Sequence, residues 1–280
     1  MKPLPYRQAF ITGGSSGIGY AIAKHLVARG VDVTIAARQV DRLRSACEGL
    51  QKIASGDSRV ETIELDITNR EQVADAVESM DAAGKVPDLL VNCAGMSYPD
   101  YFDKFDSAVF DQTITVNLTG TWNMLRAMVP LMGPGSRVVN VASVSGLVGT
   151  FGYTAYSASK FGLVGLSEAL RNELSIRGIG VTVLCPPDTD TPQLEQENRT
   201  KPYETKVISG NAGILSPEQV AISLFRGIKR RKFIIVPGLM GKITFLVKRF
   251  FPGLVYSIID ADAKKAHRRK NNEGNRTEKY

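Results

Sequence analysis

The chain has 280 residues, of which 43% are hydrophobic and 22% are charged; this composition suits a folded domain with a sizeable core and excludes a disordered chain or a repetitive fibre. The formal net charge of +7 arises entirely in the C-terminal part, since residues 1–228 carry 21 basic and 24 acidic side chains and residues 229–280 carry 14 basic and 4 acidic ones. An acidic body disfavours a nucleic-acid-binding core, whereas the basic C-terminal part suits an anionic surface.

Strand-like and helix-like patterns alternate from the start of the chain. Continuous apolar runs predict strands at residues 8–12, 31–37, 60–65, 88–92, 137–142 and 180–184. Apolar residues at helical spacing predict helices at residues 18–29, 40–50, 70–83, 156–176 and 216–229, and two more within residues 107–131. This alternation predicts an α/β fold of the Rossmann type, a doubly wound parallel sheet with helices on both faces. We expect a single domain over residues 1–230 and a C-terminal helical appendage over residues 231–280.

A glycine-rich loop, Thr-Gly-Gly-Ser-Ser-Gly-Ile-Gly, occupies residues 12–19 between the first predicted strand and the first predicted helix. Gly13 and Gly17 allow a turn and close backbone approach, and Gly19 lets the helix pack on the sheet. The free N–H groups of the helix N-terminus then suit a pyrophosphate. The spacing is not Gly-x-Gly-x-x-Gly, and a tight turn alone would explain the glycines; the position after the first strand favours a dinucleotide site.

Position 38 bears on the choice of dinucleotide. A carboxylate about 20 positions after the loop would bind the ribose 2′-hydroxyl of NAD. Here the second strand ends at Arg38, and Arg42 follows one helical turn later. A guanidinium in this place can pair with the 2′-phosphate of NADP. The sequence therefore predicts NADPH/NADP as the cofactor, although a solvated strand-end charge would also explain Arg38.

Tyr156 and Lys160 lie four residues apart in a predicted helix, so their side chains share a face. A nearby ammonium is expected to lower the pKa of the Tyr156 phenol toward the operating range. Ser143 follows the predicted strand 137–142, where its hydroxyl could bind a substrate carbonyl. An amphipathic helix surface would explain the tyrosine–lysine spacing alone, but the upstream glycine loop favours a catalytic group.

These motifs resemble the short-chain dehydrogenase/reductase family over roughly residues 5–230. The matching motifs are Thr12-Gly13-x-x-x-Gly17-x-Gly19, Asn92-Cys93-Ala94-Gly95, Asn117, Ser143 and Tyr156-x-x-x-Lys160. The resemblance implies that Tyr156 donates a proton, Ser143 orients the carbonyl and Lys160 holds the nicotinamide ribose. It further implies that Asn117 supports a proton relay through water and that the subunits form a homodimer or homotetramer.

The expected NADP-binding residues come from several predicted loops. They are Gly13, Ser15, Ser16, Gly17, Ile18, Arg38, Arg42, Asp66, Ile67, Asn92, Ala94, Gly95, Tyr156, Lys160, Pro186 and Thr189. Within this set, the resemblance implies that Asp66 and Ile67 flank the adenine. Residues 1–230 are therefore interpreted as an NADP-binding reductase domain.

The segment after the sixth strand departs from the Pro-Gly that most members of the family have there. Cys185-Pro-Pro-Asp-Thr-Asp-Thr-Pro192 and Glu197-Asn-Arg-Thr-Lys-Pro-Tyr-Glu-Thr205 look like the corresponding segments of 3-ketodihydrosphingosine reductases. That resemblance implies NADPH-dependent reduction of a long-chain amino-ketone lipid. We expect residues 186–206 to form a lid and Asp188 and Asp190 to pair with the substrate ammonium.

Other interpretations of these segments stay open. The chain could reduce another lipid-like ketone, such as a β-ketoacyl or steroid ketone, or it could be a non-catalytic NADP-binding scaffold. The proline-rich segment could also be a stiffened loop without substrate preference. A nucleic-acid binder is the weakest alternative, because the body is acidic and the basic residues alternate with long aliphatic ones.

Residues 232–270 combine apolar stretches with basic residues. Lys248, Arg249 and Pro252 interrupt the apolar runs, so none reaches the roughly 18 residues of a spanning helix. We expect helices that lie on a membrane surface, followed by a flexible tail at residues 271–280; packing on the domain or at a subunit interface is the alternative. The prediction is a cytoplasmic, peripherally membrane-associated enzyme, at the cytosolic face of the endoplasmic reticulum in a eukaryote.

Three further residue patterns limit the interpretation. The chain starts almost at once with an apolar strand, so we expect no cleaved signal peptide. Cys47, Cys93 and Cys185 are too far apart to indicate a disulfide framework or a metal cluster, and no metal is expected. His25 and His267 also lack a ligand partner at a useful spacing.

Overall fold

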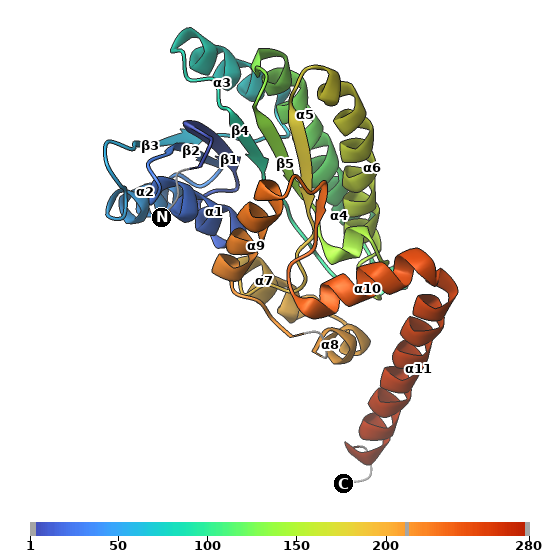
Figure 1. Ribbon diagram of the computed structural model, residues 1–280. Helices are drawn as coiled ribbons and strands as arrows, with labels where there is room; N and C mark the ends of the chain where they lie inside the picture. The colour runs from blue at the N-terminus through green and yellow to red at the C-terminus, as the bar shows by residue number, and fades with distance from the viewer. Residues whose placement is uncertain (1–3, 211–212, 278–280) are drawn as a thin grey trace.

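The computed structural model describes residues 4–210 and 213–277 of the chain. Its strands within these ranges form one parallel sheet with the order β3-β2-β1-β4-β5-β6-β7 (Figure 1). The strands are β1 (Gln8–Thr12), β2 (Asp32–Ala37), β3 (Val60–Glu64), β4 (Leu89–Asn92), β5 (Arg137–Val141), β6 (Gly180–Leu184) and β7 (Ile234–Ile235). The predicted Rossmann-type sheet is confirmed, and β7 is an edge strand that the sequence did not predict.

Helices cover both faces of this sheet. They are α1 (Gly17–Val27), α2 (Val40–Gln51), α3 (Arg70–Ala82), α4 (Ser107–Ile114), α5 (Gly120–Met128), α6 (Thr154–Ile176) and α9 (Pro217–Lys229). Because successive strand residues point to opposite faces, Ile11 packs in the core beneath α1, α2 and α9, whereas Phe10 packs in the core beneath α3, α5 and α6. The two cores fix the sheet from both sides.

Local capping signals set several of the helix ends. Asn69 precedes α3 and accepts hydrogen bonds from the N–H groups of Glu71 and Gln72. Ser216 forms a capping box with Gln219 at the start of α9. Gly30 adopts a positive φ of 79° just after α1, which a residue without Cβ tolerates. These capping residues and the glycine explain why the predicted ends of these helices lie close to the observed ones.

The strand order changes direction between β1 and β4. The chain runs outward from β1 through β2 to β3, then returns to place β4 on the other side of β1. In open parallel sheets, a reversal of this kind leaves a crevice at the carboxyl ends of the strands, where ligands bind. The glycine-rich loop and the segment after β4 both enter this crevice.

The polar segment after β6 is more regular than the predicted lid. It contains α7 (Pro192–Thr200), and α8 (Tyr203–Gly210) follows it. Thr191 begins α7, and its hydroxyl accepts a hydrogen bond from the Leu194 N–H at 3.3 Å. The proline at the first position of α7 suits a helix start, since its missing N–H needs no partner there. The prolines therefore delimit short helices over the crevice.

The C-terminal segment consists of α10 (Leu239–Phe250) and α11 (Pro252–Thr277). Figure 1 shows α11 projecting from the body beyond α8 and α10, against which it packs. The predicted tail differs, since α11 continues through residues 271–277; the last part of that tail, residues 278–280, lies outside the described residues. In the described part of the chain, no helix is both long and apolar enough to cross a membrane.

Candidate active site

The glycine loop adopts the conformation that its residues predict. Gly13 and Gly17 have φ angles of +67° and +54°, values that L side chains rarely adopt. A Cβ on Gly13 would lie 2.8 Å from the backbone nitrogen of Ala94. Thr12 joins the same two segments, because its hydroxyl accepts hydrogen bonds from the N–H groups of Cys93 and Ala94 at 3.1 Å each. The loop is therefore packed tightly against the segment that follows β4.

A cavity of about 620 Å³ lies along the carboxyl ends of the strands. Most of the expected site residues line it: Gly13, Ser15, Ser16, Gly17, Ile18, Arg38, Arg42, Asp66, Ile67, Ala94, Gly95, Ser143, Tyr156, Lys160, Pro186, Asp188 and Thr189. Asn92, Asn117 and Asp190 are not part of this lining. The structure thus brings the glycine loop, the arginines and the catalytic candidates to one cavity.

At the far side of the crevice from β2, Ser143 follows β5, while Tyr156 and Lys160 lie in the first turns of α6. The Lys160 Nζ atom lies 5.5 Å from the centre of the Tyr156 ring. The same Nζ donates a hydrogen bond to the Val141 carbonyl at 2.9 Å. The predicted tyrosine–lysine pair therefore faces the end of β5, next to Ser143.

The pKa of Tyr156 moves in the direction opposite to the expected one. Burial of the phenol raises its pKa most strongly, and the Glu197 carboxylate raises it further. Hydrogen bonding with Ser143 lowers it by less. The expectation of a pKa lowered by Lys160 is wrong for this reason: burial penalises the phenolate more than the neighbouring groups stabilise it. The phenol stays protonated, which suits a proton donor.

Lys160 is itself only 5% exposed. Burial lowers the pKa of its ammonium to about 8, although Cys93, Cys185 and Glu197 act in the opposite direction. The Lys160 ammonium therefore loses its proton at a pH only slightly above neutral. Gly146 makes this burial possible, since a Cβ there would lie 2.7 Å from the Lys160 carbonyl.

Asn117 lies in a turn of π-helix, Thr115–Thr119, between α4 and α5, an irregularity frequent at functional sites. Its side chain is fully buried. The amide donates to the Met96 carbonyl and to Ser159 Oγ, and it accepts from the Met96 N–H at 2.8 Å. These contacts fix the segment after β4 against α6. The predicted water relay stays a prediction.

Asn92 lies beneath the cavity instead of lining it. Its amide donates to Asn140 Oδ1 at 2.9 Å, and Asn140 in turn donates to Ser167. Since Ser167 belongs to α6, this chain of hydrogen bonds places the Asn92 side chain on the face of the sheet that α6 covers. The assignment of Asn92 to the cofactor stays a prediction.

The cavity end near β2 holds the residues expected at the adenosine part of a nucleotide. Arg38 and Arg42 are exposed at its rim. Asp66 accepts hydrogen bonds from the N–H and hydroxyl of Thr68, and Ile67 is buried against Gly120. Positive charge lies at the outer edge and an apolar wall lies inside, an arrangement that fits a phosphorylated ribose and its base.

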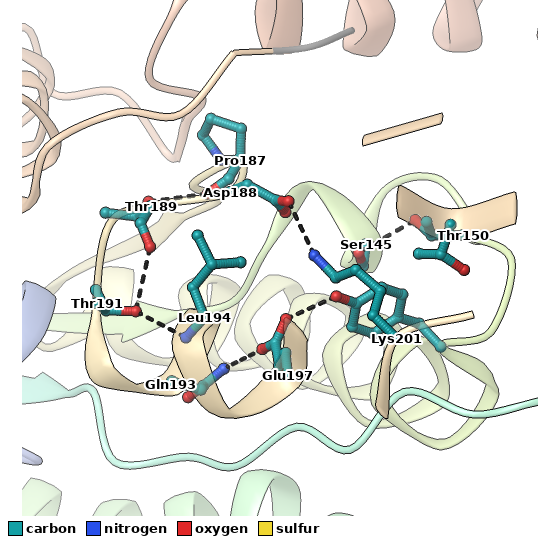
Figure 2. Close-up of polar contacts among 12 residues, drawn as sticks. Ser145, Thr150, Pro187, Asp188, Thr189, Thr191, Gln193, Leu194, Glu197 and Lys201 are labelled. Carbon is teal, nitrogen blue, oxygen red and sulfur yellow. Dashed lines mark hydrogen bonds and ion pairs between the residues drawn. The ribbon is translucent and has the colours of Figure 1, made fainter. Parts of the chain in front are cut away.

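The two aspartates of the segment after β6 have different environments. Asp188 lines the cavity, and its Oδ2 pairs with the Lys201 ammonium at 3.2 Å, as Figure 2 shows. Asp190 is exposed and outside the cavity lining. Its N–H donates to the Leu215 carbonyl at 2.9 Å, which holds the chain in an isolated bridge. Asp190 is thus not placed to bind a ligand in the cavity, contrary to the sequence-based expectation.

Sequence reasoning missed three cavity residues that act together: Tyr153, Gln193 and Glu197. The Glu197 carboxylate accepts hydrogen bonds from the Tyr153 hydroxyl at 2.6 Å and from the Gln193 amide at 2.9 Å. Only the four-residue spacing of Gln193 and Glu197 could have indicated a shared helix face, since α7 was not predicted.

The glycine positions provide a test of whether a dinucleotide fits. A Cβ on Gly17 would lie 3.0 Å from Thr191, and one on Gly19 would meet the Gly13 carbonyl. Side chains at these two positions would therefore clash at the loop that is expected to hold the pyrophosphate. The N-terminus of α1 opens into the same cavity as Tyr156 and Lys160. Together the loop, the arginine rim and the Ser–Tyr–Lys group define a dinucleotide-dependent oxidoreductase.

Comparison with known proteins gives the family. The protein-family model described as short chain dehydrogenase matches residues 7–202 of this chain. The chain belongs to the short-chain dehydrogenase/reductase family, as its motifs predicted.

Three relatives indicate the type of member. The chain is 36% identical over 268 residues to a 3-ketodihydrosphingosine reductase of Dictyostelium discoideum, an alignment that covers 89% of this chain and 80% of that protein. It is 40% identical over 239 residues to a 3-ketodihydrosphingosine reductase of Bos taurus, with 83% and 72% covered. A short-chain dehydrogenase from Sphingobium yanoikuyae in complex with NADPH has a TM-score of 0.72 and 26% identity, with 83% and 88% covered.

Proposed function

We propose that this chain is an NADPH-dependent reductase that converts the ketone of 3-ketodihydrosphingosine to the hydroxyl of dihydrosphingosine. The observation that carries the proposal is one cavity, lined at the β2 end by Arg38 and at the β5 end by Ser143 and Tyr156. The relatives named 3-ketodihydrosphingosine reductase support the choice of a long-chain amino-ketone. The site therefore combines a nucleotide end and a carbonyl end in one space.

The nucleotide end is built to hold NADPH. The N–H groups at the start of α1 would hold a pyrophosphate, and the guanidinium groups of Arg38 and Arg42 would pair with the 2′-phosphate. Asp66 and Ile67 would hold the adenine, and Lys160 would hold the nicotinamide ribose. When bound, NADPH would supply the hydride that reduces the carbonyl carbon.

The carbonyl end supplies the proton. Ser143 accepts a hydrogen bond from the Ser145 N–H at 3.1 Å, and its own hydroxyl donates to the Pro186 carbonyl at 3.5 Å, a long contact that can be exchanged for the substrate oxygen. Tyr156 then transfers its phenolic proton to the developing alkoxide, which is more basic than the phenolate even when burial raises the pKa of Tyr156. The Lys160 ammonium stabilises the phenolate that remains. The O–H bond of the product thus forms as that of Tyr156 breaks.

The C-terminal helices support an additional proposal, contact with a membrane surface. Leu239, Ile243, Leu246 and Phe250 recur at helical spacing along α10, and each is at least 43% exposed. The opposite side of α10 packs on the domain through Phe245. An exposed apolar stripe next to basic residues suits the interface of an anionic bilayer.

The basic residues of this segment lie on α10 and from the middle of α11 onward. Lys248 and Arg249 occur in the last turn of α10, and residues 264–270 include five lysines and arginines. We place the enzyme in the cytoplasm, at the cytosolic face of the endoplasmic reticulum in a eukaryote. Its water-insoluble substrate would then reach the cavity from the bilayer to which the enzyme is bound.

Vesicle co-sedimentation tests the membrane proposal. The triple variant Ile243→Ser, Leu246→Ser and Phe250→Ser should lose binding to vesicles that contain anionic lipid, and it should retain reduction of a detergent-dispersed ketone. Wild-type protein that stays in the supernatant at low salt would contradict this proposal and leave the reductase assignment standing.

The predicted homodimer or homotetramer remains a proposal as well. Trp122 on α5 and Phe161 on α6 are 47% and 44% exposed, and Phe110 on α4 is 39% exposed. Because such large aromatic side chains are enriched at subunit interfaces, we assign this face to the contact between subunits. Light scattering on Trp122→Glu protein should give a smaller particle than wild type, and an unchanged mass would remove this assignment.

A substrate panel tests the reductase proposal. Consumption of NADPH is measured with 3-ketodihydrosphingosine, a β-ketoacyl thioester and a steroid ketone, each also with NADH. We expect the sphingoid ketone with NADPH to give the highest kcat/KM. A higher value for the β-ketoacyl or steroid ketone would change the substrate class, and turnover of none of them would indicate a scaffold.

A further inference from the structure

Glu197 presents a buried negative charge to the cavity. Its residue is only 6% exposed, and it lies among the residues that line the cavity. Both hydrogen-bond donors that the structure gives its carboxylate, the Tyr153 hydroxyl and the Gln193 amide, are neutral. Burial and the Glu197 charge both raise the pKa of Tyr153, so this partner stays an uncharged phenol. The direct contacts of the carboxylate among these residues are therefore hydrogen bonds from neutral groups.

No cation forms an ion pair with this carboxylate in the described part of the chain. Lysine, arginine and histidine nitrogens form ion pairs elsewhere there, but none lies within 4.0 Å of the Glu197 carboxylate. The nearest buried lysine in the segment, Lys201, is 1% exposed at its side chain and pairs with Asp188 instead. The other buried ammonium of this cavity, that of Lys160, donates to the Val141 carbonyl and acts on Glu197 only through space. The Glu197 carboxylate thus has no ion-pair partner of its own, and an unpaired buried charge is costly.

The position of Glu197 relative to the carbonyl-binding group is suited to an amino-ketone. Tyr153, which donates to Glu197, has its ring centre 5.7 Å from that of Tyr156. In the proposed substrate the ammonium is attached to the carbon next to the carbonyl. A group that binds this ammonium must therefore lie beside the groups that bind the ketone oxygen. Glu197 meets this condition, whereas the exposed Asp190 does not.

A second polar group of the cavity lining, the Ser97 hydroxyl, has no hydrogen-bond partner among the described residues. Ser97 is only 6% exposed. Because buried hydroxyls are nearly always hydrogen-bonded, this one is expected to meet a polar group of a ligand. The proposed substrate has a primary hydroxyl next to its ammonium. The cavity lining thus contains a hydroxyl without a partner as well as a buried carboxylate.

We propose that Glu197 is the specificity-determining residue that binds the ammonium of the amino-ketone and selects it over uncharged ketones. This inference rests on the proposed function, since it names the part of that substrate which the cavity recognises. The ammonium would become the ion-pair partner that Glu197 lacks, and Tyr153 and Gln193 would hold the carboxylate in place. Asp188, already paired with Lys201, would shape the lid.

The experiment compares two ketones of equal chain length. One is 3-ketodihydrosphingosine, and the other is the same 1-hydroxy-3-ketone without the 2-amino group. Wild-type protein should prefer the amino-ketone in kcat/KM. Glu197→Gln should lower kcat/KM for the amino-ketone by about 10- to 100-fold, mainly through KM, because a hydrogen bond to a charged partner is lost. The amine-free ketone should lose clearly less, because the Glu197 charge acts on its reduction only through the pKa of Tyr156 and of Lys160.

Glu195→Gln is the matched control, because Glu195 is exposed on the same helix. It should leave both ketones unaffected. Equal losses for the two ketones in Glu197→Gln, or no loss, would overturn the inference. If that variant does not fold, the wild type still decides: equal kcat/KM for both ketones would also overturn it while the reductase function stands. Turnover of neither ketone would instead contradict the proposed function.

Discussion

Replacement of the buried Lys160 should stabilise the protein while it removes activity. Burial lowers the Lys160 pKa from 10.5 to about 8, which corresponds to about 3 kcal/mol by which folding disfavours the charged amine. In Lys160→Met this cost disappears, and loss of the hydrogen bond to Val141 offsets about 1 kcal/mol of the gain. We therefore expect Lys160→Met to be more stable by about 2 kcal/mol at pH 7, without added nucleotide.

The gain should depend on pH in a defined direction. Lys160 has a lowered folded-state pKa, so the unfolded chain binds more protons between pH 8 and 10.5 and wild-type stability rises through that window. The advantage of Lys160→Met should therefore shrink by about 2 kcal/mol between pH 7 and pH 9.5. Urea unfolding at several pH values measures this, with Lys24→Met as the control at an exposed lysine.

Two outcomes would refute the reasoning about Lys160. If Lys160→Met were less stable than wild type at pH 7, the burial cost would be smaller than the contacts of the ammonium. If the advantage were the same at pH 7 and pH 9.5, the folded-state pKa of Lys160 would not be lowered. A matching pH-dependent change in Lys24→Met would show that the effect is not specific to the buried site.

Three other variants test separate parts of the account. Tyr156→Phe should lower kcat by at least about 1,000-fold while the Kd for NADPH, measured by fluorescence, stays within about threefold; wild-type turnover would remove the proton donor. Arg38→Asp should lower kcat/KM with NADPH by about 100-fold and leave that with NADH little changed, and equal losses would contradict the 2′-phosphate contact. His267→Ala removes the 2.8 Å contact to the buried Glu204 that joins α11 to α8, so hydrogen exchange in α11 should accelerate, and unchanged exchange would show that other contacts hold the helix.

The same contact has a predicted acid dependence. Burial acts to raise the pKa of Glu204, but hydrogen bonds from Tyr101 and His267 outweigh it, and the net pKa is lowered. A lowered carboxyl pKa stabilises the folded state above the unfolded value, and this contribution is lost as the pH falls through the folded value. Acid should therefore loosen α11 in wild type more than in Glu204→Gln, as measured by hydrogen exchange.

The sequence predicted the sheet well because its strands are continuous apolar runs between clear helix signals. Residues 8–12 and 180–184 agree with β1 and β6 at both ends. The two-residue strand β7 was missed, since a pair of residues carries no period. The π-helical turn around Asn117 was missed for a similar reason, because the apolar spacing continues through it.

The candidate site shows the same difference between residues with a clear sequence signal and residues without one. Residues fixed by local motifs, such as Gly13, Tyr156 and Lys160, reach the cavity as expected. Residues whose role depends on a distant partner did not show in the sequence. Glu197 is buried because α7 folds over the crevice. Burial of the Tyr156 phenol, and then the Glu197 charge, raise the pKa of Tyr156. Spacing reveals neighbours within one element, but not the electrostatic environment that several elements create.

Transfer of hydride to carbon 3 of the amino-ketone tests the central claim most directly. Wild-type protein is incubated with 3-ketodihydrosphingosine and NADPH that carries deuterium at both positions of nicotinamide carbon 4, so that hydride transfer from either face is labelled, and the product is analysed by mass spectrometry. The account predicts dihydrosphingosine with one deuterium on carbon 3, formed in equal amount to the NADPH consumed. Recovery of the unchanged ketone, or NADPH consumption without a deuterated product, would contradict it.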